Sequence, residues 1–142
     1  STDVLIFTML KTSLLIAASL ALCSVCLGAF GAHTLKPLLS SEQLLSYETA
    51  VRYQMYHSLA ALIVLSFYGR LNKKQVVRIT QLFYLGILLF SGSIYLLACR
   101  DLLGISNYRW LGPITPIGGI IFMAGWIYLI FAFSKMKSET EK

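Results

Sequence analysis

Four apolar stretches alternate with short polar segments along the chain, and this pattern predicts the fold. The apolar core of a bilayer requires about 20 apolar residues per helix, and the stretches predict helices at about residues 12–30, 41–68, 79–99 and 114–133. The second stretch is apolar only over residues 53–68. Ser40 and Gln43 resemble a capping box, which predicts that this helix begins earlier, near Ser41. The sequence thus predicts an all-α membrane protein, a four-transmembrane-helix bundle in which residues 1–142 form one domain.

Composition supports a lipid environment. Hydrophobic residues make up 57% of the chain and charged residues only 13%, whereas a soluble domain is usually about 25% charged. A soluble protein of this size could not bury so much apolar surface, so the lipid bilayer is an expected partner. The net charge of +6 does not indicate nucleic-acid binding, because the basic residues lie singly or in one short cluster between apolar runs.

The distribution of charge predicts the orientation. Basic residues without acids concentrate between the second and third helices, and further lysines lie near both ends of the chain. Positive charge collects in loops that stay in the cytoplasm, so both termini are expected on the cytoplasmic side, with the first and third connections at the outer face. Residues 1–8 precede a sequence, beginning at Met9, that resembles a natural start. They are expected to be an N-terminal extension or a helix lying at the membrane interface.

Small residues recur on one face of the first predicted helix and again in the last. Such residues let helices approach closely in lipid. They serve either an interface with another protein or contact with the chain's own helices, and the internal contact is favoured. The predicted helix-packing residues are Ala17, Ala21, Ser24, Gly28, Gly31, Gly118 and Gly125.

Polar side chains collect where the first and third connections are expected. Glu48 and Arg52 are four residues apart on a helix, the favourable order for an ion pair. The group is either a pocket for a small molecule, lipid headgroup or metal, or a hydrogen-bonded clasp between the two connections, and the clasp is favoured. Two histidines and one glutamate have no recognised metal-ligand spacing, so no metal and no cofactor are expected. The predicted outer-face polar cluster comprises His33, Glu48, Arg52, Tyr56, His57, Asn107, Arg109 and Thr115.

Four blocks carry a family resemblance: residues 28–35 (GAFGAHTL), 48–57 (ETAVRYQMYH), 90–95 (FSGSIY) and 111–119 (LGPITPIGG). In this order they resemble the YgdD family, domain-of-unknown-function family 423, which is related to mitochondrial transmembrane protein 256. The resemblance implies four transmembrane helices in a bacterial inner (plasma) membrane, or in a mitochondrial inner membrane. It implies no particular reaction or ligand.

The function expected from these features is non-enzymatic. The sequence has no nucleotide-binding loop, no nucleophile motif and no zinc-helix motif. The small-residue face favours an accessory or scaffolding subunit, with other membrane protein subunits or further copies of the chain as partners. The alternative is a small-molecule or lipid binder or transporter that uses the outer-face polar cluster.

Overall fold

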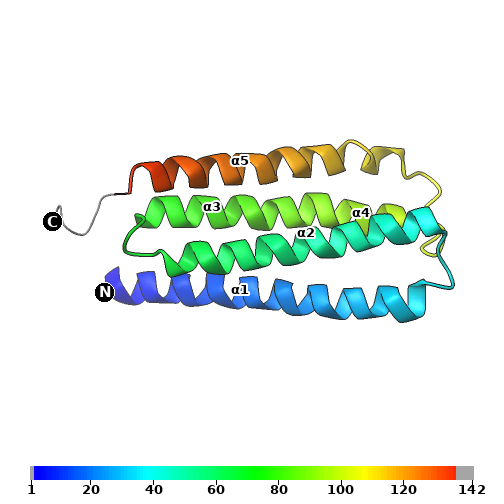
Figure 1. The fold of residues 1–142 in the computed structure, drawn as a ribbon, viewed down its shortest axis with the longest axis horizontal. Coiled ribbons are helices and arrows are strands. Elements are labelled where there is room, and N and C mark those ends of the chain that lie inside the picture. Colours follow the sequence, from blue (N-terminus) through cyan, green and yellow to red (C-terminus); the bar gives the residue numbers. More distant parts are fainter. Residues whose placement is uncertain (1, 137–142) are drawn as a thin grey trace.

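The computed structural model describes residues 2–136, and this part of the chain is helical without a β-strand. Figure 1 shows long helical rods that lie side by side, with successive rods running in opposite directions. Residue 1 and residues 137–142, which include part of the basic C-terminal tail used to predict the orientation, lie outside the described residues. The helical elements are α1 (Thr2–Phe30), η1 (Gly31–Leu35), α2 (Ser41–Ser66), α3 (Lys73–Gly86), η2 (Ile87–Ser91), α4 (Gly92–Ala98), η3 (Arg109–Leu111) and α5 (Ile114–Ser134).

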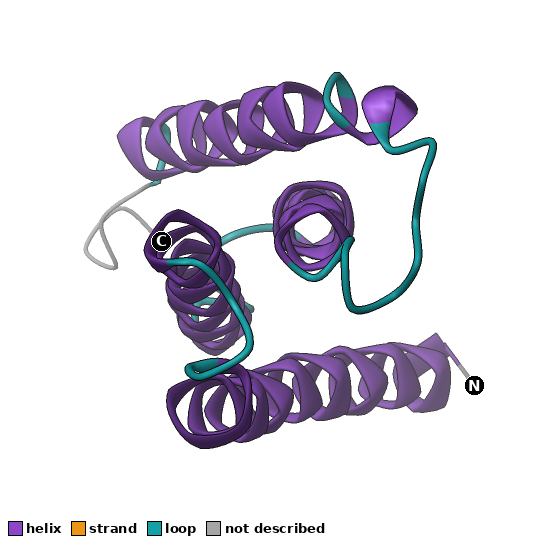
Figure 2. Ribbon diagram, turned by 90° about the vertical axis from the view of Figure 1, so that its right-hand side faces the viewer, coloured by secondary structure: helices purple, strands orange, loops and turns teal. Residues whose placement is uncertain are grey.

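The rods are arranged in layers. Helix α1 packs mainly on α2, and α5 packs mainly on α3 and η2, so that α2 and the α3–α4 rod lie between α1 and α5. The end-on view of Figure 2 shows this order. Helix α2 contacts α1 on one side and α3, η2 and α4 on the other. The four-helix all-α fold predicted from the sequence is therefore confirmed.

Helix α2 differs from the other rods in its polarity. Segments Thr2–Leu35, Lys73–Ala98 and Arg109–Ser134 are long and apolar enough to cross a membrane, and α2 is not among them. Its buried positions include Gln54, His57 and Ser58. Because α2 lies between other helices, these polar side chains face protein rather than lipid, which is where polar groups inside a membrane are tolerated.

The helix ends follow local sequence signals. Ser40 caps α2 and Asn72 caps α3, and each forms a complete capping box, with Gln43 and Gln75 respectively. The Asn72 box explains why the third rod begins at Lys73 rather than at the expected residue 79. Residues 2–8 continue α1 without a break.

Two segments of the described chain are π-helical. Gly31–Leu35 extends α1, and Ile87–Ser91 joins α3 to α4. A π-turn inserts an extra residue into a helix and rotates the side chains that follow it. In the third rod it lies where the backbone of Phe90 meets Gly118 of α5.

The small residues of α1 face α2 within the same chain. Ala17 and Ser24 are buried, and a Cβ atom built on Gly31 would lie 2.5 Å from the ring of Tyr47. A Cβ on Gly28 would lie 3.3 Å from the side chain of Val51. The contact between α1 and α2 therefore uses these small residues, for which an interface with another protein was the alternative. In α5, Gly118 and Gly125 similarly face the third rod, and Ala21 of α1 is half-buried.

Candidate functional site

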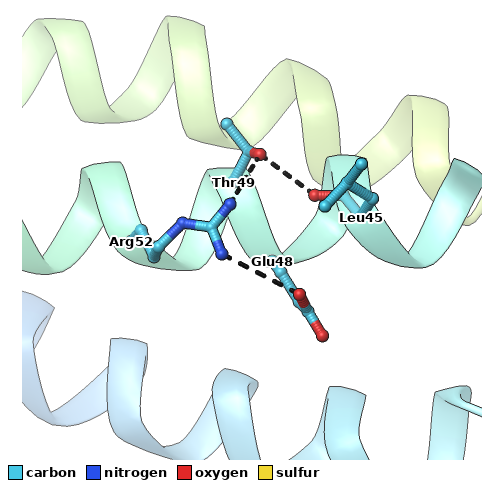
Figure 3. Close-up of polar contacts among 4 residues, drawn as sticks. All are labelled: Leu45, Glu48, Thr49 and Arg52. Carbon is cyan, nitrogen blue, oxygen red and sulfur yellow. Dashed lines mark hydrogen bonds and ion pairs between the residues drawn. The ribbon is translucent and has the colours of Figure 1, made fainter.

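The Glu48–Arg52 pair lies on the exposed face of α2. The Arg52 Nη1 and Glu48 Oε2 atoms are 3.8 Å apart, and the two side chains are 46% and 50% exposed. Arg52 also donates a hydrogen bond to Thr49 Oγ1 over 3.2 Å, and Thr49 donates to the carbonyl oxygen of Leu45. Figure 3 shows that all these polar contacts stay within one helix. The pair thus forms as expected but does not link the two outer connections.

The structure corrects the predicted convergence of the outer-face polar cluster. His57 follows Arg52 by five residues, which turns it about 140° around an α-helix. It therefore points into the bundle, whereas Arg52 points out. Thr115 bonds instead to Ser93 of α4, over 2.5 Å. The remaining members of the predicted cluster are exposed and do not join the pair: His33, Tyr56, Asn107 and Arg109.

His57 is the central polar residue of the interior. It is 4% exposed, and it contacts Trp126 of α5. Trp126 lies twelve residues, or about 18 Å of helix, from the first residue of α5. His57 therefore lies well inside the bundle, not at the outer face where the sequence analysis placed it.

The hydrogen bonds of His57 determine its protonation. Trp126 Nε1 is a donor only, and it donates to His57 Nε2 over 3.0 Å, so that Nε2 carries no proton. His57 Nδ1 therefore carries the proton and donates it to the carbonyl oxygen of Tyr53 over 2.8 Å. Both ring nitrogens have hydrogen-bond partners. A second proton, on Nε2, would point at the N–H group of Trp126, which can only donate. In this arrangement the histidine is neutral.

Aromatic rings enclose the same histidine. The ring of Phe122 is stacked on His57 with centroids 3.5 Å apart, and Phe83 approaches with its edge at 5.4 Å. Tyr53 lies on another side, with a centroid distance of 6.0 Å. These rings come from α2, α3 and α5, so the contacts join three rods at one level.

Gln54 organises a second polar group, between α1, α2 and α4. Its Nε2 donates to the carbonyl oxygen of Leu20 over 2.9 Å, and its Oε1 accepts a hydrogen bond from the Tyr95 hydroxyl over 2.7 Å. The Tyr95 ring packs on Tyr47, whose hydroxyl donates to the carbonyl oxygen of Leu27. A single amide thus links three helices.

Buried serines add bonds from one helix to the backbone of another. Ser24 of α1 donates to the carbonyl oxygen of Val51, and Ser91 of η2 donates to that of Ala50, each over 2.8 Å. Within residues 2–136, no buried side-chain nitrogen or oxygen lacks a hydrogen-bond partner. The described residues also contain no group of three or more His, Cys, Asp or Glu side chains able to hold a metal ion.

The sequence contained a signal for this interior network that the analysis of charged residues missed. Tyr47, Ala50, Gln54 and His57 recur at spacings of three, four and three, which is one face of a helix. All four are buried. The polar residues of α2 therefore separate into an exposed face with Glu48–Arg52 and a buried face that holds the bundle together.

The fold and this interior define a multi-pass helical membrane protein with a polar central helix. Residues 27–119 match the model of the family described as Protein of unknown function (DUF423), and the chain belongs to this family. It is 40% identical over 129 residues to the UPF0382 membrane protein SH2409 of Staphylococcus haemolyticus, covering 89% of this chain and 98% of the relative. It is 36% identical over 127 residues to the UPF0382 membrane protein YwdK of Bacillus subtilis, with the same coverage. No solved structure gives a significant match. The chain is thus a multi-pass bacterial membrane protein.

Proposed function

We propose that this protein is a non-enzymatic accessory or scaffolding subunit of a membrane assembly. The observation that carries this proposal is the use of the buried polar groups. His57, Gln54 and the buried serines bond to other helices or to the backbone, and none of them is left to meet a substrate. A catalytic or transport site requires polar groups that change partners during turnover. A network in which every partner is already engaged fits a rigid structural element.

The outer surface of α5 supports contact with other membrane helices. Ile120, Met123, Ile127 and Ile130 are each more than half exposed and recur at spacings of three, four and three. This spacing places large apolar side chains along one seam of α5, and we propose that a second membrane helix covers this seam in place of lipid. Both termini are proposed to lie in the cytoplasm, as the positive charges between α2 and α3 favour.

The alternative of a binder or transporter at the outer-face polar cluster has less support. That function needs converging polar groups, whereas Glu48 and Arg52 pair at the surface and His57 lies in the interior. An exposed pair of this kind contributes only about 0–1 kcal/mol of stability and encloses no ligand. The structure therefore favours the subunit role over binding at this position.

The mass of the protein extracted from its own membrane tests the subunit role. A chain of 15.8 kDa that belongs to an assembly should appear in native mass spectrometry with further polypeptide chains in a fixed ratio. The same chain synthesised in vitro into lipid nanodiscs provides the control, because no other membrane protein is present there. A doubled mass in both preparations would assign the assembly to copies of this chain. A single chain in both preparations would contradict the proposal.

A further inference from the structure

An apolar groove lies between α1 and α3, at the end of the bundle that carries the α2–α3 connection. It has a volume of about 320 Å³. Ile6, Met9 and Ile16 line it from α1, and Val76 and Tyr84 line it from α3. Helix α1 packs mainly on α2 rather than on α3, which leaves this space between the two helices open to the membrane.

The length of the groove corresponds to one leaflet of a bilayer. Its lining extends from Ile6 to Ile16 on α1, about 15 Å of helix, and half of the hydrocarbon core of a bilayer is also about 15 Å. The Tyr84 hydroxyl, at the deep end, donates to the Ser13 carbonyl oxygen and contacts Ser13 Oγ, each over 2.8 Å. This link joins α1 to α3 within the groove.

A second cavity adjoins the shallow end of the groove and is basic. It has a volume of about 400 Å³ and is lined by Lys73, Lys74 and Arg78. Met9 and Lys73 line both cavities, so the two spaces are adjacent. Within the described residues none of these three cations has a carboxylate partner, and no acidic residue lines either cavity. The charge there is available to an anion.

We propose that the groove and the basic cavity together form a binding site for one anionic phospholipid. An acyl chain would lie in the groove, and the phosphodiester headgroup would meet Lys73, Lys74 and Arg78. Basic pockets between transmembrane helices bind anionic lipid headgroups in this way. A zwitterionic lipid carries an ammonium group that would face the same three cations, so the site selects anionic over zwitterionic headgroups.

Competition between two lipids with identical acyl chains tests the proposal. The purified chain is presented with equal amounts of phosphatidylglycerol and phosphatidylcholine, and the bound lipid is identified by native mass spectrometry. We expect one phosphatidylglycerol to be retained in preference to phosphatidylcholine. Equal retention of the two lipids by the unchanged protein would show that only ordinary surrounding lipid is bound, and would overturn the proposal.

Charge-matched variants locate the site. Lys73→Gln/Arg78→Gln removes two cations from the basic cavity, and Lys36→Gln/Arg109→Gln removes the same two residue types from the opposite end of the bundle. Each basic residue near an anionic lipid surface contributes about fivefold in affinity, so the first variant should lose about 25-fold in preference while the second keeps it. An equal loss in both variants would mean that net charge alone selects the lipid, and the site would be excluded.

A second pair of variants tests the groove independently of charge. Met9→Trp places a large ring where the two cavities meet, and Leu22→Trp adds a similar ring on an exposed part of α1 that lines neither cavity. Met9→Trp should reduce retention of phosphatidylglycerol at unchanged thermal stability, and Leu22→Trp should not. Full retention by the Met9→Trp variant would exclude the acyl chain from the groove.

Discussion

The contact between α5 and the π-helical turn of the third rod gives the sharpest prediction of stability. A Cβ atom built on Gly118 would lie 2.7 Å from the Cα atom of Phe90 and closer still to the backbone nitrogen of that residue. The obstacle is backbone, which cannot move aside as a flexible side chain can. One residue further, a Cβ on Gly119 would lie 3.8 Å from the Phe90 ring, an ordinary van der Waals contact. The two neighbouring glycines thus differ only in the space beside them.

Alanine at each position separates this close contact from helix propensity. Replacing glycine by alanine inside a helix stabilises it by about 0.5–1 kcal/mol, and this gain applies to both positions. Overpacking costs about 1–3 kcal/mol, and it applies only to Gly118. We therefore expect Gly118→Ala to lower the free energy of unfolding by about 1–2 kcal/mol, and Gly119→Ala to raise it slightly.

Thermal unfolding of both variants in the same mild detergent measures the difference. Gly118→Ala should melt below the unchanged protein, and Gly119→Ala should melt at or above it. If Gly118→Ala is as stable as Gly119→Ala, the third rod and α5 do not approach as closely as described, and the role given to the π-helical turn is wrong.

Two further substitutions and one control distinguish the buried from the exposed face of α2. Trp126→Phe leaves the buried Nε2 atom of His57 without a donor and should lower the free energy of unfolding by about 1–3 kcal/mol. Trp110→Phe, at an exposed position, is the control and should lower it little. Equal melting temperatures of the two variants would contradict the hydrogen bond. Arg52→Gln removes one partner of the exposed pair with Glu48 and should change stability by about 0–1 kcal/mol. A loss above 3 kcal/mol would show instead that this pair is buried.

Much of the fold follows from local sequence signals. The four apolar stretches predict the four rods, and the Ser40–Gln43 box predicts the start of α2 within a residue. The Asn72–Gln75 box likewise marks the start of α3 at Lys73, six residues before the start that the apolar stretch alone predicts. Local signals suffice here because a helix cap involves residues only three apart.

The candidate site was less predictable, because it depends on which face of α2 meets its neighbours. Spacing alone identifies the Glu48–Arg52 pair, since both partners lie on one helix. The partner of His57 is Trp126, 69 residues away on α5. No spacing rule selects that tryptophan over Trp110. His57 is close in sequence to Glu48 and Arg52, but its rotation around the helix places it on the buried face of α2.

The central claim is that α2, although more polar than the other rods, crosses the membrane as the inner helix of four. Single cysteines in a background without Cys23, Cys26 and Cys99 test it on intact cells, with a thiol reagent that cannot cross the membrane. Leu38→Cys, before α2, should be labelled, and Lys74→Cys, after α2, should be labelled only once the cells are opened. Labelling of both positions on intact cells would place the two ends of α2 on one side of the membrane and contradict the account.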